Sequence, residues 1–184
     1  MALSVRLHSR ALTELSYVGL RTHSVASDGA PVLGDGVDNG IRRAKQLRAE
    51  AARVRGEAGE RLERAAESLA SGQTAVAHRQ RDLAEVAMCH YMAYEELAAA
   101  AEHRGKATRF VRGMTAREIE IHRAYAAIRR AEGHRERGEA IRCRDDAFAA
   151  LRHRELAGEA EEKARVAELR AFELLEAGAN ERKP

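Results

Sequence analysis

Histidine, cysteine and acidic residues are the side chains of this sequence that could hold a metal or carry out acid–base and nucleophilic chemistry. The eight histidines are His8, His23, His78, His90, His103, His122, His134 and His153. No two of them are four residues apart, and no glutamate has a histidine three residues later. The spacings of a helical zinc site and of a di-iron bundle site are therefore missing. Glu118 and His122, four residues apart, supply half a metal site at most, so we expect no metal and no cofactor.

Cys89-His90 is the segment with the highest density of reactive side chains, but its geometry argues against catalysis. Adjacent residues of a helix point about 100° apart, so these two side chains cannot act together on one small ligand. The sequence also has no phosphate-binding GxxxxGK[ST] loop, no GxGxxG and no GxSxG nucleophile elbow. We expect a protein that is not an enzyme; the alternative is a bundle enzyme or carrier with a pocket lined by His90, Tyr94 and Tyr125.

A basic stretch at residues 103–117, HRGKATRFVRGMTAR, is the main candidate for a functional site. It contains no acid and five cations, which are Arg104, Lys106, Arg109, Arg112 and Arg117. The rest of the chain carries 27 cations against 29 acids, so the whole net charge of +3 comes from this stretch. Phe110 could stack on a base, which makes RNA or DNA the expected anionic partner. The alternative is a connector neutralised by acids on neighbouring helices, such as Glu95, Glu96 and Glu102.

Composition predicts an all-α protein. Ala, Arg, Glu, Leu and Lys supply 109 of the 184 residues, above the roughly 50% that is typical of long helices and coiled coils. Prolines occur only at positions 31 and 184, and no apolar run approaches the roughly 18 residues of a membrane span. The two cysteines make no disulfide framework, which indicates a reducing compartment and a cytoplasmic location.

Helical periodicity and turn residues divide the chain into three parts. Residues 1–27 form a short amphipathic segment, and residues 28–40, DGAPVLGDGVDNG, are expected to be a loop because glycine and aspartate favour turns. A helical domain covers residues 41–184. Its first two helices, at 41–70 and 74–103, form an antiparallel hairpin whose ends we assign to Gly72 and Gly105.

The third helix is predicted to begin at a capping box. Thr115 stands at the N-cap and Glu118 three residues later, which lets each side chain satisfy a backbone N–H of the first turn. The helical pattern continues to residue 177, with a break expected near Gly158. The fold class is therefore a helical hairpin plus a long C-terminal helix or helices, in a bundle or coiled-coil-like arrangement.

Large apolar side chains are scarce, and this predicts self-association. Ile, Leu, Val and Phe total 34 residues, and alanine offers little surface to bury. An Ala-aromatic-x-x-Leu/Ile pattern, expected to form packing clusters, recurs at Tyr94, Tyr125, Phe148 and Phe172. Such helices gain by packing on a second copy or on a partner protein. The expected function is a self-associating, non-enzymatic scaffold or adaptor that docks to a larger assembly, with nucleic-acid binding as the alternative.

Overall fold

The structure is a computed structural model in which residues 35–110 and 114–180 are described. It confirms the all-α class: the described residues form four helices and no strand. The helices are α2 (Asp35–Ala70), α3 (Thr74–Ala107), α4 (Met114–Arg142) and α5 (Ala147–Asn180). The chain divides into two units, residues 1–31 and 32–184, and all described residues belong to the second. The predicted segment 1–27 and the first part of the predicted loop lie outside the described residues.

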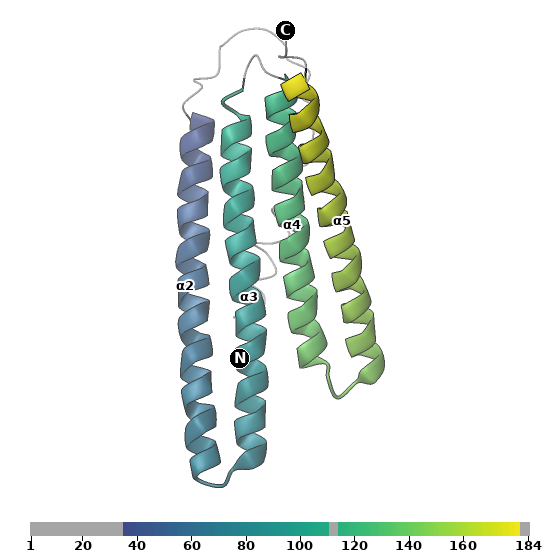
Figure 1. The fold of residues 1–184 in the computed structure, drawn as a ribbon. Helices are drawn as coiled ribbons and strands as arrows, with labels where there is room; N and C mark the ends of the chain where they lie inside the picture. Colours follow the sequence, from purple (N-terminus) through teal and green to yellow (C-terminus); the bar gives the residue numbers. More distant parts are fainter. Residues whose placement is uncertain (1–34, 111–113, 181–184) are drawn as a thin grey trace, which may run out of the picture. The chain divides into compact units, whose positions relative to one another are not determined.

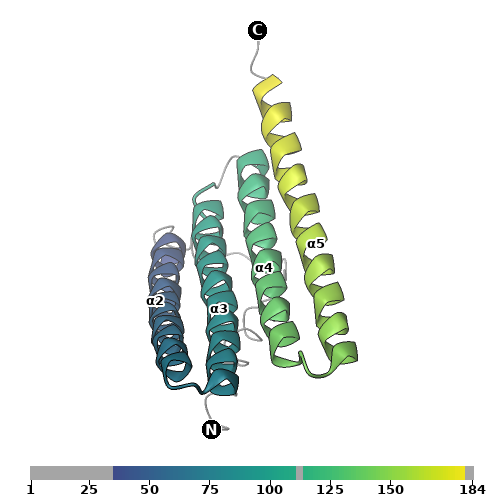
Figure 2. The same cartoon turned by 60° about the horizontal axis from the view of Figure 1, so that its bottom comes forward.

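The four helices lie side by side in chain order, as Figures 1 and 2 show from two directions. Contacts join α2 to α3, α3 to α4 and α4 to α5, and no other pair among these four helices. The predicted hairpin and the predicted helical bundle are confirmed. The helices of the bundle lie in a single layer, in which α2 and α5 each have one helical neighbour.

Alanine dominates the contacts between the helices. Among the buried apolar residues, every one with less than 2% of its surface exposed is an alanine. Ala126, Ala164 and Ala167 form the cluster between α4 and α5, and Val54, Ala58 and Ala87 form the cluster between α2 and α3. Because alanine holds neighbouring helices close together, little space remains between them for larger side chains.

The predicted aromatic packing clusters are wrong for α4 and α5. In three of the four Ala-aromatic pairs of this pattern, the alanine is buried. The two aromatic side chains of α5 face solvent: Phe148 is 82% exposed and Phe172 is 55% exposed. Tyr94 alone of the four aromatics packs against an apolar cluster, the one between α2 and α3. A close contact between alanines explains the difference, since it excludes a ring from the interface.

Glycines mark close helix contacts more often than helix ends. α2 begins at Asp35, so the predicted loop ends earlier than expected and Gly40 lies inside the helix. A Cβ atom on Gly40 would lie 2.9 Å from both the carbonyl oxygen of Ala101 and the Cα of Gly105. Gly105 is buried within α3, which continues to Ala107, so its predicted role as a helix terminator is wrong.

Gly72 does end α2 as predicted. Its φ of 77° is left-handed, its N–H donates to the carbonyl of Leu69, and the N–H of Gln73 donates to the carbonyl of Ser68. These two bonds are those of a Schellman motif. α3 ends differently, because the Thr108 hydroxyl donates to the carbonyl of Gly105 over 2.7 Å.

The predicted break in the C-terminal helix exists, but at residues 143–146 and not near Gly158. Asp146 accounts for this position: its Oδ1 accepts hydrogen bonds from the N–H groups of Phe148 (3.1 Å) and Ala149 (3.0 Å), as an N-cap does. Gly158 is tolerated within α5. At the other boundary, α4 begins at Met114, so Thr115 lies in its first turn and not at the predicted N-cap.

We predict opposite effects on stability for alanine at two glycines. Gly40→Ala should destabilise the fold by about 1–3 kcal/mol, because the new methyl group meets backbone that must move. Gly158→Ala, where nothing lies within 4 Å, should stabilise it by roughly 0.8–1 kcal/mol through helix propensity. Urea unfolding followed by circular dichroism measures both, and a stabilising Gly40→Ala would contradict the close contact of α2 and α3.

Candidate functional site

The basic stretch is divided between the adjoining ends of two helices and their connection. Arg104 and Lys106 lie exposed in the last turn of α3, and Arg109 and the 40% exposed Phe110 follow its end. Arg117 is exposed near the start of α4, and Arg112 lies outside the described residues. The fold also brings Arg43 of α2 to this end of the layer, because Gly40 packs on Gly105. We call Arg43, Arg104, Lys106, Arg109 and Arg117 the basic end.

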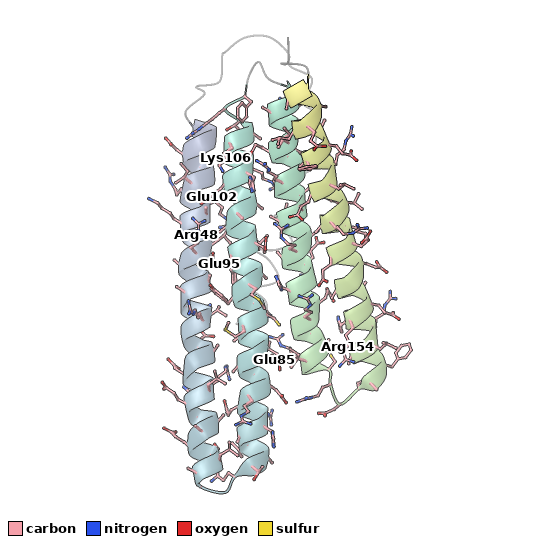
Figure 3. All side chains as sticks on the ribbon, in the orientation of Figure 1. Arg48, Glu85, Glu95, Glu102, Lys106 and Arg154 are labelled. Carbon is pink, nitrogen blue, oxygen red and sulfur yellow. The ribbon has the colours of Figure 1, made fainter. Side chains whose placement is uncertain are left out.

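The acids expected to neutralise the basic end are engaged elsewhere. Glu102 and Glu95 lie 2.5 and 3.9 Å from the guanidinium of Arg48 on α2, and Figure 3 shows this group at the contact between α2 and α3. Glu96 pairs over 2.9 Å with Arg130 of α4, which also binds Glu168 of α5. These acids therefore tie the helices together, and each already has a cationic partner outside the basic end.

A buried acid near the basic end is also occupied. Glu120 of α4 is the one charged residue that is buried among those described, and its carboxylate lies 2.7 Å from Nδ1 of His103 and 2.9 Å from Arg123. Burial by itself raises the pKa of Glu120, but the hydrogen bonds and charges of His103 and Arg123 outweigh burial and hold that pKa below its ordinary value. Within the described residues, the cations of the basic end form no ion pair, while Asp38 and Glu118 are exposed nearby.

Stabilisation of the helix dipole explains only part of the basic end. Cations in the last turn of a helix interact favourably with its negative end, and this accounts for Arg104 and Lys106. Arg117 lies in the first turn of α4, where the dipole disfavours a positive charge. The helix dipole therefore accounts for Arg104 and Lys106 but not for Arg117.

A second candidate surface, on α5, was missed by the sequence reasoning. Six large apolar side chains of this helix are exposed: Phe148, Leu151, Val166, Leu169, Phe172 and Leu175. Phe148 and Leu151 are separated from Val166 and Leu169 by 18 residues, or five helical turns, so the two pairs lie on the same side of α5. That side faces away from α4, since Ala157, Ala164 and Ala171 on the opposite side are buried. The Ala-aromatic-x-x-Leu/Ile pattern identified Phe148 and Phe172 in the sequence but predicted that their side chains pack inside the protein.

The groups considered for catalysis do not assemble into a site. His90 lies beside Gly138 of α4, whereas Tyr94 packs with Val54 of α2, and the Tyr125 ring lies 4.8 Å below the guanidinium carbon of Arg129. Burial raises the pKa of the Cys89 thiol, the opposite of what a nucleophilic thiolate needs. The described residues hold no group of three side chains that could bind a metal ion.

Across residues 35–110 and 114–180, no helix has both the length and the apolar character that crossing a bilayer needs. No protein-family model, curated protein or solved structure matches this chain. Its function must therefore be inferred from its own surfaces.

The ion pairs of Glu120 predict a specific dependence of stability on pH. Because the pKa is lowered in the folded state, ionised Glu120 stabilises the fold above the ordinary glutamate pKa of about 4.3, and this contribution is lost as the pH falls. Glu120→Gln should cost about 1.5–3 kcal/mol at pH 7 and less at pH 3.5. Urea unfolding at both pH values tests this, with the exposed Glu118→Gln as control; equal losses at both pH values would contradict it.

Proposed function

We propose that the protein is a non-enzymatic helical scaffold that self-associates and docks through α5 to a larger assembly. The observation that carries the proposal is the exposed apolar side of α5. Two exposed apolar pairs, Phe148 with Leu151 and Val166 with Leu169, lie on this side, and exposed groups of large apolar side chains mark sites of interaction. The layer supports this interpretation, because α5 has one helical neighbour and its outer side is left without a partner in the described residues.

In this scaffold, one set of side chains holds the helices together and another set is available for docking. Alanine contacts and interhelical ion pairs hold α2 to α5 together, which leaves the large apolar side chains of α5 available for another protein. A cytoplasmic location belongs to this proposal, supported by two cysteines that are both free.

Docking through α5 can be tested with acidic substitutions. Val166→Glu combined with Leu169→Glu should abolish assembly into the larger complex, because docking would bury two carboxylates in an apolar contact. Size-exclusion chromatography of a lysate from the cells that make the protein should show the parent well above the mass of the purified protein, and the variant at the purified mass. Gln73→Glu with Thr74→Glu, exposed at the turn between α2 and α3, adds the same charge as a control. A parent that elutes at its purified mass would refute docking.

A second candidate function is the binding of nucleic acid at the basic end. It is supported by the ion pairs of Glu95, Glu96 and Glu102 with cations outside that region. The exposed Phe110 beside Arg109 adds a surface on which an unpaired base can stack. Single-stranded RNA or DNA is the form that this combination of cations and one aromatic side chain fits.

Removing three cations of the basic end tests whether it binds nucleic acid. Arg104→Ala, Lys106→Ala and Arg109→Ala together should weaken binding of a fluorescent single-stranded oligonucleotide irrespective of its sequence. They should also reduce the slope of log K against log salt by about 2, at roughly 0.7 per lost phosphate contact. Arg79→Ala, Arg81→Ala and Arg152→Ala remove the same charge from exposed positions of α3 and α5. Equal affinities for the two triple variants would show that the basic end is not the binding site.

A further inference from the structure

One side of α2 faces away from α3 and has no helical neighbour among the described residues. Its positions alternate in steps of three and four residues, as in a coiled coil, and all are exposed. We call this set the outer face of α2; it comprises Arg42, Lys45, Ala49, Ala52, Gly56, Gly59, Glu63, Ala66 and Ala70. The opposite side, with Leu47, Ala51 and Val54, is buried against α3.

The charges of the outer face are ordered along the helix. Arg42 and Lys45 lie in its first third, one turn after the exposed Asp38, its middle consists of alanine and glycine, and Glu63 lies in its last third with Glu67 beside it. Arg42, Lys45, Glu63 and Glu67 form no ion pair within the described part of the chain. Other charges of α2 do form pairs, as Arg48 does with Glu102, Arg53 with Glu50 and Arg64 with Glu60.

The small residues in the middle of the outer face would let another helix approach closely. Gly56 and Gly59 each cost the helix about 1 kcal/mol relative to alanine, and nothing lies within 4 Å of where their Cβ atoms would be. Elsewhere in this protein, Gly40, Gly133 and Gly138 are helical glycines that lie against a neighbouring helix, whereas Gly158 is in open space as Gly56 and Gly59 are. A further helix packed on the outer face would give Gly56 and Gly59 the environment of the first three.

We propose that two copies of the chain pair through the outer faces of α2, antiparallel and about a two-fold axis beside residue 54. The proposal rests on the self-association in the proposed function and names the face and the partner. In this register Lys45 lies opposite Glu63 of the partner subunit, and Ala52 lies opposite Gly56 of the partner subunit. Two-fold symmetry forms each contact twice, so Lys45 and Glu63 gain partners in both copies and the small residues meet at the crossing.

The charges also argue against other pairings of identical helices. A parallel pair of α2 helices would place cation beside cation and Glu63 beside Glu63 of the partner subunit. A two-fold pair of α5 helices that joined their apolar positions would bring Glu155 against Glu162 of the partner subunit. Near the proposed axis, the charge of Arg53 is met by Glu50 at 2.8 Å and by Glu57, and Arg55 is drawn toward α3, where it lies over the Tyr91 ring.

A charge swap tests the proposed contact on the purified, full-length chain. Sedimentation equilibrium from about 1 to 200 μM should show a dimer of the 20.3 kDa chain. Lys45→Glu or Glu63→Lys alone should weaken dimerisation about ten- to a hundred-fold, since each change turns two attractive contacts into repulsive ones. The double variant, which restores opposite charges across the axis, should recover most of the parent affinity. Arg81→Glu, an exposed change on α3, is the matched control.

Disulfide cross-linking tests the orientation. In a background of Cys89→Ala and Cys143→Ala, chains with Lys45→Cys should cross-link to chains with Glu63→Cys after mixing, and neither should cross-link to itself. Self-cross-linking of either variant would overturn the antiparallel pairing. An oligomer that neither single charge change weakens would place self-association on another face and leave the scaffold proposal standing. A purified parent that stays monomeric would overturn the α2 pairing, while docking through α5 is judged by its separate assay in lysate.

Discussion

Close approach of neighbouring helices through alanine is the constraint on which the rest of the structure depends. A methyl group between two helices buries little surface, so each contact adds little stability by itself and must be repeated along the whole length of the pair. That requirement fits the lengths of the helices, which run from 29 to 36 residues. The same constraint keeps large side chains out of the contacts, which leaves Phe148, Leu151, Val166 and Leu169 on the outer side of α5.

Ion pairs at the edges of the contacts add the specificity that alanines lack. A run of methyl groups permits one helix to slide along another by a turn, whereas a charged pair at a fixed level favours one register. Arg48 performs this role between α2 and α3, and Arg130 performs it for three helices at once through Glu96 and Glu168. At the same contacts, half-burial and then the neighbouring charge of Arg137 lower the pKa of His134 below its ordinary value, although Glu96 and Glu161 act in the opposite direction.

Local features of the fold could be predicted from the sequence, and the arrangement of the helices could not. The all-α class follows from composition, and the α2–α3 hairpin follows from helical periodicity and a short connection. The end of α2 follows from Gly72. Gly40 and Gly105 were misjudged because a glycine at a close helix contact looks in sequence like one at a helix end. Gly158 was misjudged because an exposed glycine inside a helix, with nothing within 4 Å, gives the same sequence signal as a break. For the candidate site, the exposed cations Arg104, Lys106, Arg109 and Arg117 were predictable, since charge density is local. The engagement of Glu95 and Glu102 by Arg48 was not, because it depends on which helix lies beside α3.

The order of contacts along the layer also has a consequence for folding. Each helix touches only the helices that precede and follow it in the chain, so every interface forms between segments joined by a short connection. Such topologies have low contact order and fold quickly, because little chain entropy is lost in closing each loop. They also behave like one-dimensional arrays, in which the end units are held by a single interface. Local opening should accordingly begin at α2 and α5, the two helices that carry the free outer faces, while α3 and α4 stay paired longest.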